Sequence, residues 1–254
     1  MKRHLPNMLT LLNLALGTTA IVLTLEGQWR SGVVLLLAAG VLDFLDGWVA
    51  RLLGAYSETG KQLDSLADMV TFGVVPALFI YTIFQRLFIS ADGTGSSPSP
   101  ILQWIILGSV LLVPVFSAIR LARFTTREDA GPFFSGLPTP AHALFWTGLF
   151  WQIMQGGLIF GNRMNIFFMW AVMMLMATYM ILPVPMISLK FGHFKWKGNQ
   201  YRYLLIILAG VILVLTGIPG LTLVILTYIL LSLLNFFLRS RVTNKNIPDN
   251  HHLK

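Results

Sequence analysis

Long apolar runs follow one another along this chain, and they limit what it can fold into more than any other feature. A helix needs about 20 mostly apolar residues to cross the hydrocarbon core of a bilayer. Eight such runs are visible, at residues 8–25, 33–53, 68–88, 101–121, 141–160, 165–189, 203–217 and 221–238. They predict an all-α fold, a polytopic membrane bundle of about eight transmembrane helices.

The composition agrees with a membrane protein and excludes several other classes. Only 11% of the residues are charged, whereas soluble domains have about 25%. The net charge of +8 therefore points to basic loops beside a membrane rather than to nucleic acid. The absence of cysteine excludes disulfides, thiolate metal sites and cysteine nucleophiles.

The distribution of basic residues predicts an orientation. If eight spans place both termini on one side, 15 of the 18 Lys and Arg residues lie there, and the exceptions are Arg30, Arg86 and Arg163. Basic loops favour the cytoplasmic face. We therefore expect a protein of the cell (inner) membrane with both termini in the cytoplasm and a polar cytoplasmic tail at residues 239–254.

Four aspartates gather near the cytoplasmic end of the second and third runs. Asp43 and Asp46 are three residues apart and share one helix face, as do Asp64 and Asp68, four apart. A turn of about ten residues would make the two helices antiparallel and bring the four carboxylates together. Asp64 and Asp68 alone would also suit an ordinary helix start, but carboxylates inside a span are costly and are usually functional.

Clustered carboxylates of this kind suit hard divalent cations, which prefer oxygen ligands. Two metals that share carboxylates are a known arrangement for displacement at phosphorus. The residues alone therefore indicate a divalent-metal site that opens toward the cytoplasm.

The aspartates belong to a longer pattern with fixed spacing. Its fixed positions are Asp43, Asp46, Gly47, Ala50, Arg51, Gly60, Asp64 and Asp68. Written as D-x-x-D-G-x-x-A-R-x8-G-x-x-x-D-x-x-x-D, it resembles the signature of the CDP-alcohol phosphotransferase family. The resemblance implies a six-helix core at residues 1–190, followed by two additional C-terminal helices at 191–238.

Other stretches resemble the phosphatidylserine synthase branch of that family. They lie at residues 6–10, 64–77, 120–124 and 135–141. The resemblance implies an enzyme of phospholipid biosynthesis that transfers the phosphatidyl group from CDP-diacylglycerol to the hydroxyl of L-serine, giving phosphatidylserine and CMP. It also implies a homodimer in contact with membrane lipid, and no nucleic-acid partner.

The resemblance assigns roles to individual residues. It implies that Asp43, Asp46, Asp64 and Asp68 hold two divalent cations, Mg²⁺ or Mn²⁺, and that Asp68 is also the catalytic base for the serine hydroxyl. The residues that it implies for binding of the CDP-lipid are Asn7, Thr10, Gly47, Ala50, Arg51, Ser57 and Gly60.

Arg120 and Arg123, three residues apart at the end of the fourth run, allow two interpretations. They can anchor the span by reaching the lipid head groups, or they can bind the acceptor carboxylate or a lipid phosphate.

Three alternative functions remain open from sequence. The same chemistry could use another acceptor, glycerol 3-phosphate or inositol phosphate, or an archaeal ether-lipid donor. Intramembrane acids also occur along ion pathways, so a divalent-cation transporter is a candidate from another class.

Overall fold

A computed structural model describes residues 4–55, 57–93, 95–126, 134–156, 163–187 and 199–245. The expected boundary at 190/191 and the tail beyond residue 245 lie outside these residues. The helices and strands are α1 (His4–Leu25), α2 (Trp29–Leu53), α3 (Glu58–Asp68), the π-helix η1 (Met69–Val74), α4 (Val75–Asp92), α5 (Pro100–Ser109), α6 (Leu112–Thr126), β1 (Phe134–Ser135), α7 (Thr139–Met154), α8 (Arg163–Ile181), β2 (Pro185–Met186), α9 (Gln200–Thr216) and α10 (Gly220–Lys245).

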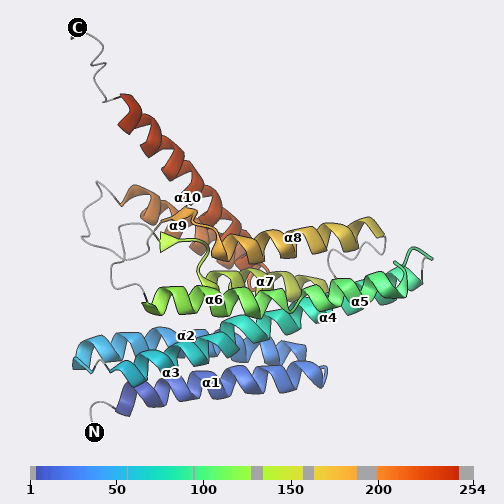
Figure 1. The fold of residues 1–254 in the computed structure, drawn as a ribbon, viewed down its shortest axis with the longest axis horizontal. Coiled ribbons are helices and arrows are strands. Elements are labelled where there is room, and N and C mark those ends of the chain that lie inside the picture. Colours follow the sequence, from blue (N-terminus) through green and yellow to red (C-terminus); the bar gives the residue numbers. More distant parts are fainter. Residues whose placement is uncertain are drawn as a thin grey trace.

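These elements form eight rods, because α3, η1 and α4 are continuous and α5 runs on into α6 (Figure 1). Among the described residues, four rods are long and apolar enough to cross a membrane: α1, α2, the rod from Glu58 to Asp92 and the rod from Pro100 to Arg123. Shorter apolar helices follow in α8, α9 and α10. The predicted fold class, an all-helical polytopic membrane bundle, is confirmed.

Two prolines interrupt the helical hydrogen bonding where the sequence predicted uninterrupted helices. Pro114 has no N–H to donate to the carbonyl of Val110, and the chain between α5 and α6 turns through tighter bonds, Val110 N to Leu107 O and Val113 N to Val110 O. Pro76 likewise cannot donate a helical hydrogen bond, and it follows η1. The helical turn before it is wider than in an α-helix, since Val75 N donates to Val70 O, five residues earlier. Neither irregularity was predicted.

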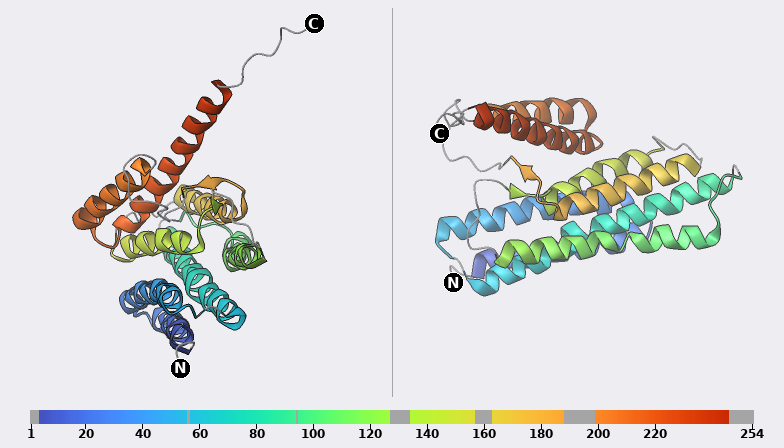
Figure 2. Two further views of the ribbon diagram at one scale, coloured as in Figure 1. Left: turned by 90° about the vertical axis from the view of Figure 1, so that its left-hand side faces the viewer. Right: turned by 45° about the horizontal axis from the view of Figure 1, so that its top comes forward.

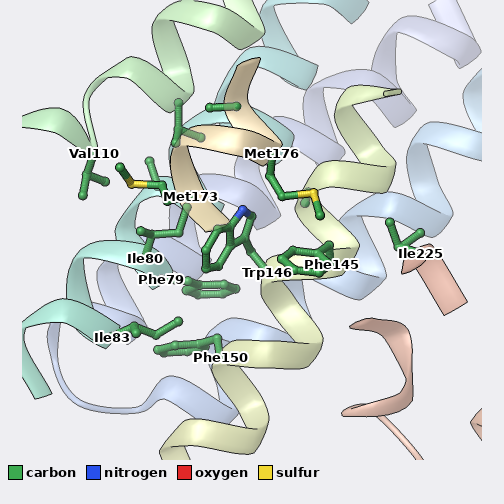
Figure 3. Packing of buried hydrophobic residues seen from close by; sticks show 14 of the residues in the cluster. Phe79, Ile80, Ile83, Val110, Phe145, Trp146, Phe150, Met173, Met176 and Ile225 are labelled. Atoms are coloured by element: carbon green, nitrogen blue, oxygen red, sulfur yellow. The ribbon is translucent and has the colours of Figure 1, made fainter. Parts of the chain in front are cut away.

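The core lies where α4 crosses α7, with α8 against both (Figure 3). Phe79 and Phe150 stack with their ring centroids 4.3 Å apart, and Trp146 is fully buried beside Phe145. By contrast, α1, α2 and α9 have many large apolar side chains on the outside, as expected for helices that face lipid.

Small residues let the helices approach closely. A Cβ at Gly17 would lie 2.5 Å from Thr71 Oγ1, so η1 packs directly on α1. A Cβ at Gly148 would lie 2.7 Å from Thr222 N, which brings the start of α10 against α7. Helices α9 and α10 lie side by side and cross the other rods at an angle (Figure 2).

The short β1–β2 ladder was not predicted. It pairs Phe134 with Met186 and Ser135 with Pro185 in antiparallel register. Gly136, at φ +77°, continues the ladder, because its N–H donates to Val184 O at 2.8 Å. The ladder ties the segment that leads into α7 to the segment that follows α8.

Candidate functional site

The aspartates are positioned by a sharp reversal between α2 and α3. Gly54 caps α2 in the left-handed conformation, at φ +58°, and Ser57 caps α3 by accepting a hydrogen bond from Gly60 N. The expected turn of about ten residues is wrong, because α3 already begins at Glu58. The short turn makes the two helices antiparallel, as predicted.

Three of the four carboxylates converge. One oxygen from each of Asp43, Asp64 and Asp68 lies within 4.8 Å of the others, and all three side chains are half-buried. Asp43 and Asp68 are within hydrogen-bonding reach of each other. The second oxygen of Asp68, Oδ1, is buried and has no hydrogen-bond partner among the described residues.

Asp46 lies outside this group of three. It is buried, and its Oδ2 accepts a hydrogen bond from Thr10 Oγ1 at 2.7 Å. Its charge still acts on Asp43, Asp64 and Asp68. The structure therefore brings all four aspartates into one electrostatic cluster, with three of them close enough to share an ion.

The π-helix η1 begins directly after Asp68. Such wide turns occur frequently at functional sites. Thr71 in this segment is fully buried and donates to Asn13 Oδ1 at 2.9 Å. This bond fixes the start of η1 against α1, and with it the orientation of the last turn of α3.

A cavity of about 650 Å³ opens beside the aspartates, between α1, α2 and α3. It contains every residue that the sequence predicted for the CDP-lipid. Its lining is Pro6, Asn7, Thr10, Asp46, Gly47, Ala50, Arg51, Ala55, Ser57, Glu58, Gly60, Lys61 and Asp64. Whether these residues bind such a lipid stays a prediction.

The glycines keep this cavity open. A Cβ at Gly47 would point toward Arg51, whose Nη2 would be 3.8 Å away, and Arg51 Nε donates back to Gly47 O at 2.9 Å. A Cβ at Gly60 would lie 2.9 Å from Ser57 Oγ and 3.1 Å from Asn7 Oδ1. A side chain at Gly60 would therefore intrude on the polar groups of the wall, whereas a Cβ at Gly47 would occupy space on the wall at ordinary contact distance from Arg51.

Four lining residues were missed: Pro6, Ala55, Glu58 and Lys61. Lys61 was counted only as a basic loop residue. Its place one residue after Gly60, in the first turn of α3, was the available signal. It adds a second cation to the cavity wall that carries Arg51.

The two predicted acceptor arginines differ in position. Arg120 is half-buried: its Nη1 donates to Thr139 Oγ1 at 3.1 Å, and its charge interacts with Asp68. Its Nε is buried without a partner among the described residues. Arg123 is exposed and reaches the carbonyl of Ile181 at 3.4 Å. Arg120 is thus linked by its charge to the aspartate cluster.

A second, apolar cavity of about 390 Å³ begins at Asp43 and runs between α2, η1 and α7. Its lining is Leu36, Leu37, Gly40, Val41, Asp43, Phe44, Phe72, Pro140, Ala143 and Leu144. The carboxylates therefore lie between a polar cavity and an apolar one.

Comparison with known proteins agrees with the motif. The sequence profile of the CDP-alcohol phosphatidyltransferase family matches residues 3–187. The chain belongs to this family. The match includes the four motif aspartates and the whole of the polar cavity, and it ends before α9 and α10.

Individual relatives share the same region. The chain is 41% identical over 160 residues, 60% of this chain and 48% of the other, to a CDP-diacylglycerol–serine O-phosphatidyltransferase of Mycobacterium leprae. It is 34% identical over 142 residues, 55% of this chain and 54% of the other, to an archaetidylserine synthase of Methanothermobacter thermautotrophicus. A CDP-diacylglycerol–serine O-phosphatidyltransferase of Bacillus subtilis is 32% identical over 137 residues, 54% of this chain and 70% of the other. The chain thus spans about half the length of the first two relatives.

Proposed function

We propose that this protein is an integral-membrane phosphotransferase that moves the phosphatidyl group of CDP-diacylglycerol to the hydroxyl of L-serine, releasing CMP. The observation that carries the proposal is the convergence of Asp43, Asp64 and Asp68 beside a polar cavity lined by the rest of the family motif. The named relatives differ in their lipid but share serine in their names.

The aspartate cluster fits divalent cations. It offers only oxygen ligands, which suit Mg²⁺ or Mn²⁺, and the buried, unpartnered Oδ1 of Asp68 is a polar atom that needs a partner. We propose that Asp43, Asp64 and Asp68, with Asp46 beside them, hold two such ions. When bound, these ions neutralise the pyrophosphate and stabilise the leaving phosphate.

The chain's own residues would bind and orient the donor. The polar cavity accepts the cytidine and ribose, with Asn7 and Ser57 on its wall. Arg51 and Lys61 offer positive charge to the phosphates, and Gly47 lets them approach the backbone of α2. The apolar cavity at Asp43 receives part of the lipid.

The transfer itself is an in-line displacement. Asp68 accepts the proton of the serine hydroxyl as general base. The serine oxygen forms a bond to the phosphorus that carries diacylglycerol, and the bond from that phosphorus to the CMP oxygen breaks. The proton stays on Asp68 until it leaves to water, and the electron pair departs with CMP.

Arg120 would hold the carboxylate of serine. Its Nε is buried without a partner among the described residues, and Thr139 fixes the other side of its guanidinium. A planar guanidinium suits bidentate recognition of a carboxylate. Arg123 is exposed, and we assign it to the membrane surface or to a lipid phosphate.

We further propose that the active site faces the cytoplasm and that the chain forms a homodimer in the cell membrane. Arg30 at the start of α2 and Arg163 at the start of α8 belong to the end of the bundle away from the aspartates. The described basic residues Arg51, Lys61 and Arg120 lie at the aspartate end, which the positive-inside rule assigns to the cytoplasm. We keep residues 1–190 as the catalytic core and 191–238 as two accessory helices.

A second candidate differs only in the donor. The similarity to an archaetidylserine synthase favours an ether lipid as an alternative to diacylglycerol. The apolar cavity can take either type of chain, because both are hydrocarbon and its lining is mostly apolar.

The experiment measures CMP release by the full chain in nanodiscs with Mn²⁺ or Mg²⁺. CDP-diacylglycerol or its ether analogue is the donor, and serine, glycerol 3-phosphate or inositol phosphate is the acceptor. Serine-dependent release that disappears in Asp68→Asn supports the proposal. Release with another acceptor alone would overturn the serine assignment. If no acceptor gives release but metal flux into vesicles is observed, the protein is a transporter instead.

A further inference from the structure

Helix α10 lies outside the region matched by the family, yet it contacts the segment that positions Arg120. Its residues Ile225, Tyr228, Leu231 and Ser232 are buried, whereas Leu223, Leu226, Leu230 and Leu234 are exposed. One face of α10 is therefore packed into the protein. Two of the four buried side chains on this face are polar, which calls for an explanation because buried polar groups need partners.

Both polar side chains bind the same residue. Tyr228 Oη donates to the carbonyl of Ile187 at 3.0 Å, and Ser232 Oγ accepts from the amide of Ile187 at 3.2 Å. The two side chains are one helical turn apart, so together they hold the N–H and the C=O of Ile187. All three residues are buried.

The clamped residue directly follows β2. Strand β2 pairs with β1, and Gly136 and Leu137 extend this contact through bonds to Val184 O and Tyr179 O. Two residues later, α7 begins at Thr139, whose hydroxyl accepts from Arg120. A continuous series of hydrogen-bonded segments therefore connects α10 to the guanidinium beside Asp68.

Helix α10 also contacts this region directly. Tyr228 lies near Arg120. At the first turn of α10, Thr222 Oγ1 donates to Phe145 O of α7 at 2.9 Å, and Gly148 leaves the space for this contact. The helix is thus fixed on α7 at one point and on Ile187 at another.

We propose that Tyr228 and Ser232 are positioning residues: by clamping Ile187 they hold the β1–β2 ladder and Thr139 so that Arg120 faces the acceptor side of the aspartate cluster. The accessory helices then contribute to binding of the acceptor rather than serving as membrane anchors alone. This inference rests on the proposed function, because it assigns the acceptor carboxylate to Arg120.

The test compares Tyr228→Phe and Ser232→Ala with the control Tyr81→Phe. Tyr81 also has a bonded hydroxyl, which accepts from Gln85 within α4, so the control removes the same atom elsewhere. With full-length protein in nanodiscs, Tyr228→Phe should raise the KM for serine about fivefold, the effect of one lost hydrogen bond. The KM for CDP-diacylglycerol should not change.

Hydrogen exchange supplies a readout that does not depend on activity. The backbone amides of Val184, Met186 and Ile187 should exchange faster in Tyr228→Phe and in Ser232→Ala than in wild type or Tyr81→Phe. If Tyr228→Phe does not fold, Ser232→Ala, which keeps the aromatic ring, decides the comparison by the same two measurements.

Several results would overturn the inference. Faster exchange with an unchanged KM for serine would make the clamp purely structural, and an equal rise in both KM values would indicate general damage. If wild type prefers another acceptor, the selective rise must appear in the KM for that acceptor. Absence of CMP release by wild type with every acceptor would remove the proposed function and this inference together, whereas an active wild type without the selective rise removes only the inference.

Discussion

Two regions of the bundle, the α4–α7 contact and the aspartate cluster, are built from apolar helices but packed in opposite ways. At the first, Phe79 and Phe150 stack in a core that is closed to solvent. At the second, carboxylates converge beside about 650 Å³ of open space, and Asp68 keeps a buried oxygen without a partner among the described residues. Dense packing stabilises a fold, whereas unpartnered buried acids cost stability. The contrast assigns stability to one region and chemistry to the other.

The largest effect is expected for Asp68→Asn. Removal of a general base should lower CMP release about 10³-fold. The midpoint of thermal unfolding should not fall, because the replaced carboxylate is repelled by Asp43, Asp46 and Asp64. Asp92→Asn, at an exposed carboxylate at the end of α4, is the control. An equal loss of activity in both variants would contradict the assignment of the chemistry to the aspartate cluster.

The opposite result is expected for Phe150→Ala. It creates a cavity at the α4–α7 contact and should lower the free energy of unfolding by about 3 kcal/mol, while the activity of each folded molecule stays near that of wild type. Phe168→Ala is the matched control, since Phe168 is 66% exposed. The measurement is thermal unfolding together with turnover per folded molecule. A large selective loss of turnover would show that the two regions are not separate.

Binding of a divalent cation should stabilise the folded protein only when the aspartate cluster is intact. Mn²⁺ at 100 times its dissociation constant should stabilise the wild type by about 2.7 kcal/mol. Asp43→Asn should lose this gain, and Phe168→Ala should keep it. The check is the thermal midpoint with and without a chelator. A gain that survives in Asp43→Asn would place the ion elsewhere.

A smaller effect is expected from a single methyl group. Gly47→Ala places a Cβ in the polar cavity and should raise the KM for the CDP-lipid about tenfold, equivalent to 1.4 kcal/mol. It should not lower stability, because alanine favours the helix more than glycine does. Gly108→Ala, in α5 with no atom within 4 Å of the added Cβ, should leave the KM unchanged. Equal KM values for both variants would argue against donor binding at Gly47.

The smallest effect concerns the support of Asp46. Thr10→Val removes the hydroxyl that donates to Asp46 Oδ2 and should lower kcat/KM about fivefold, as for one hydrogen bond. Thr18→Val provides the control, because Thr18 is exposed and, within the described part of the chain, bonds only the carbonyl of Leu14 in its own helix. The measurement is the steady-state kinetics of both variants. An equal loss of kcat/KM in the two would show that the bond from Thr10 to Asp46 has no special role.

Much of the fold could be predicted because it depends on patterns that the sequence shows directly. Apolar runs of membrane length mark the rods, and spacings of three and four residues place Asp43 with Asp46 and Asp64 with Asp68. The irregular parts depend on contacts that are distant in the chain. Nothing in the sequence indicated that a π-helix would precede Pro76. Nor did it indicate that the residues beside Gly136 and Val184 would form a β-ladder.

The site shows the same division. The motif identified the residues that line the polar cavity, but not the bonds that they make. Thr10 and Ser57 were both expected to bind the CDP-lipid. In the structure the hydroxyl of Thr10 bonds Asp46, and Ser57 Oγ caps α3. Tyr228 lies outside the motif altogether, so only the packed structure indicates where it acts, whereas Lys61 directly follows the motif residue Gly60.

The most direct test of the central claim is an experimental structure of the protein with Mn²⁺ and a CDP-lipid, with the metal located by its anomalous signal. The account predicts Mn²⁺ among Asp43, Asp64 and Asp68, with the cytidine in the cavity beside Asn7 and Arg51. Metal ions spaced across the bundle, or a nucleotide bound away from this cavity, would contradict it.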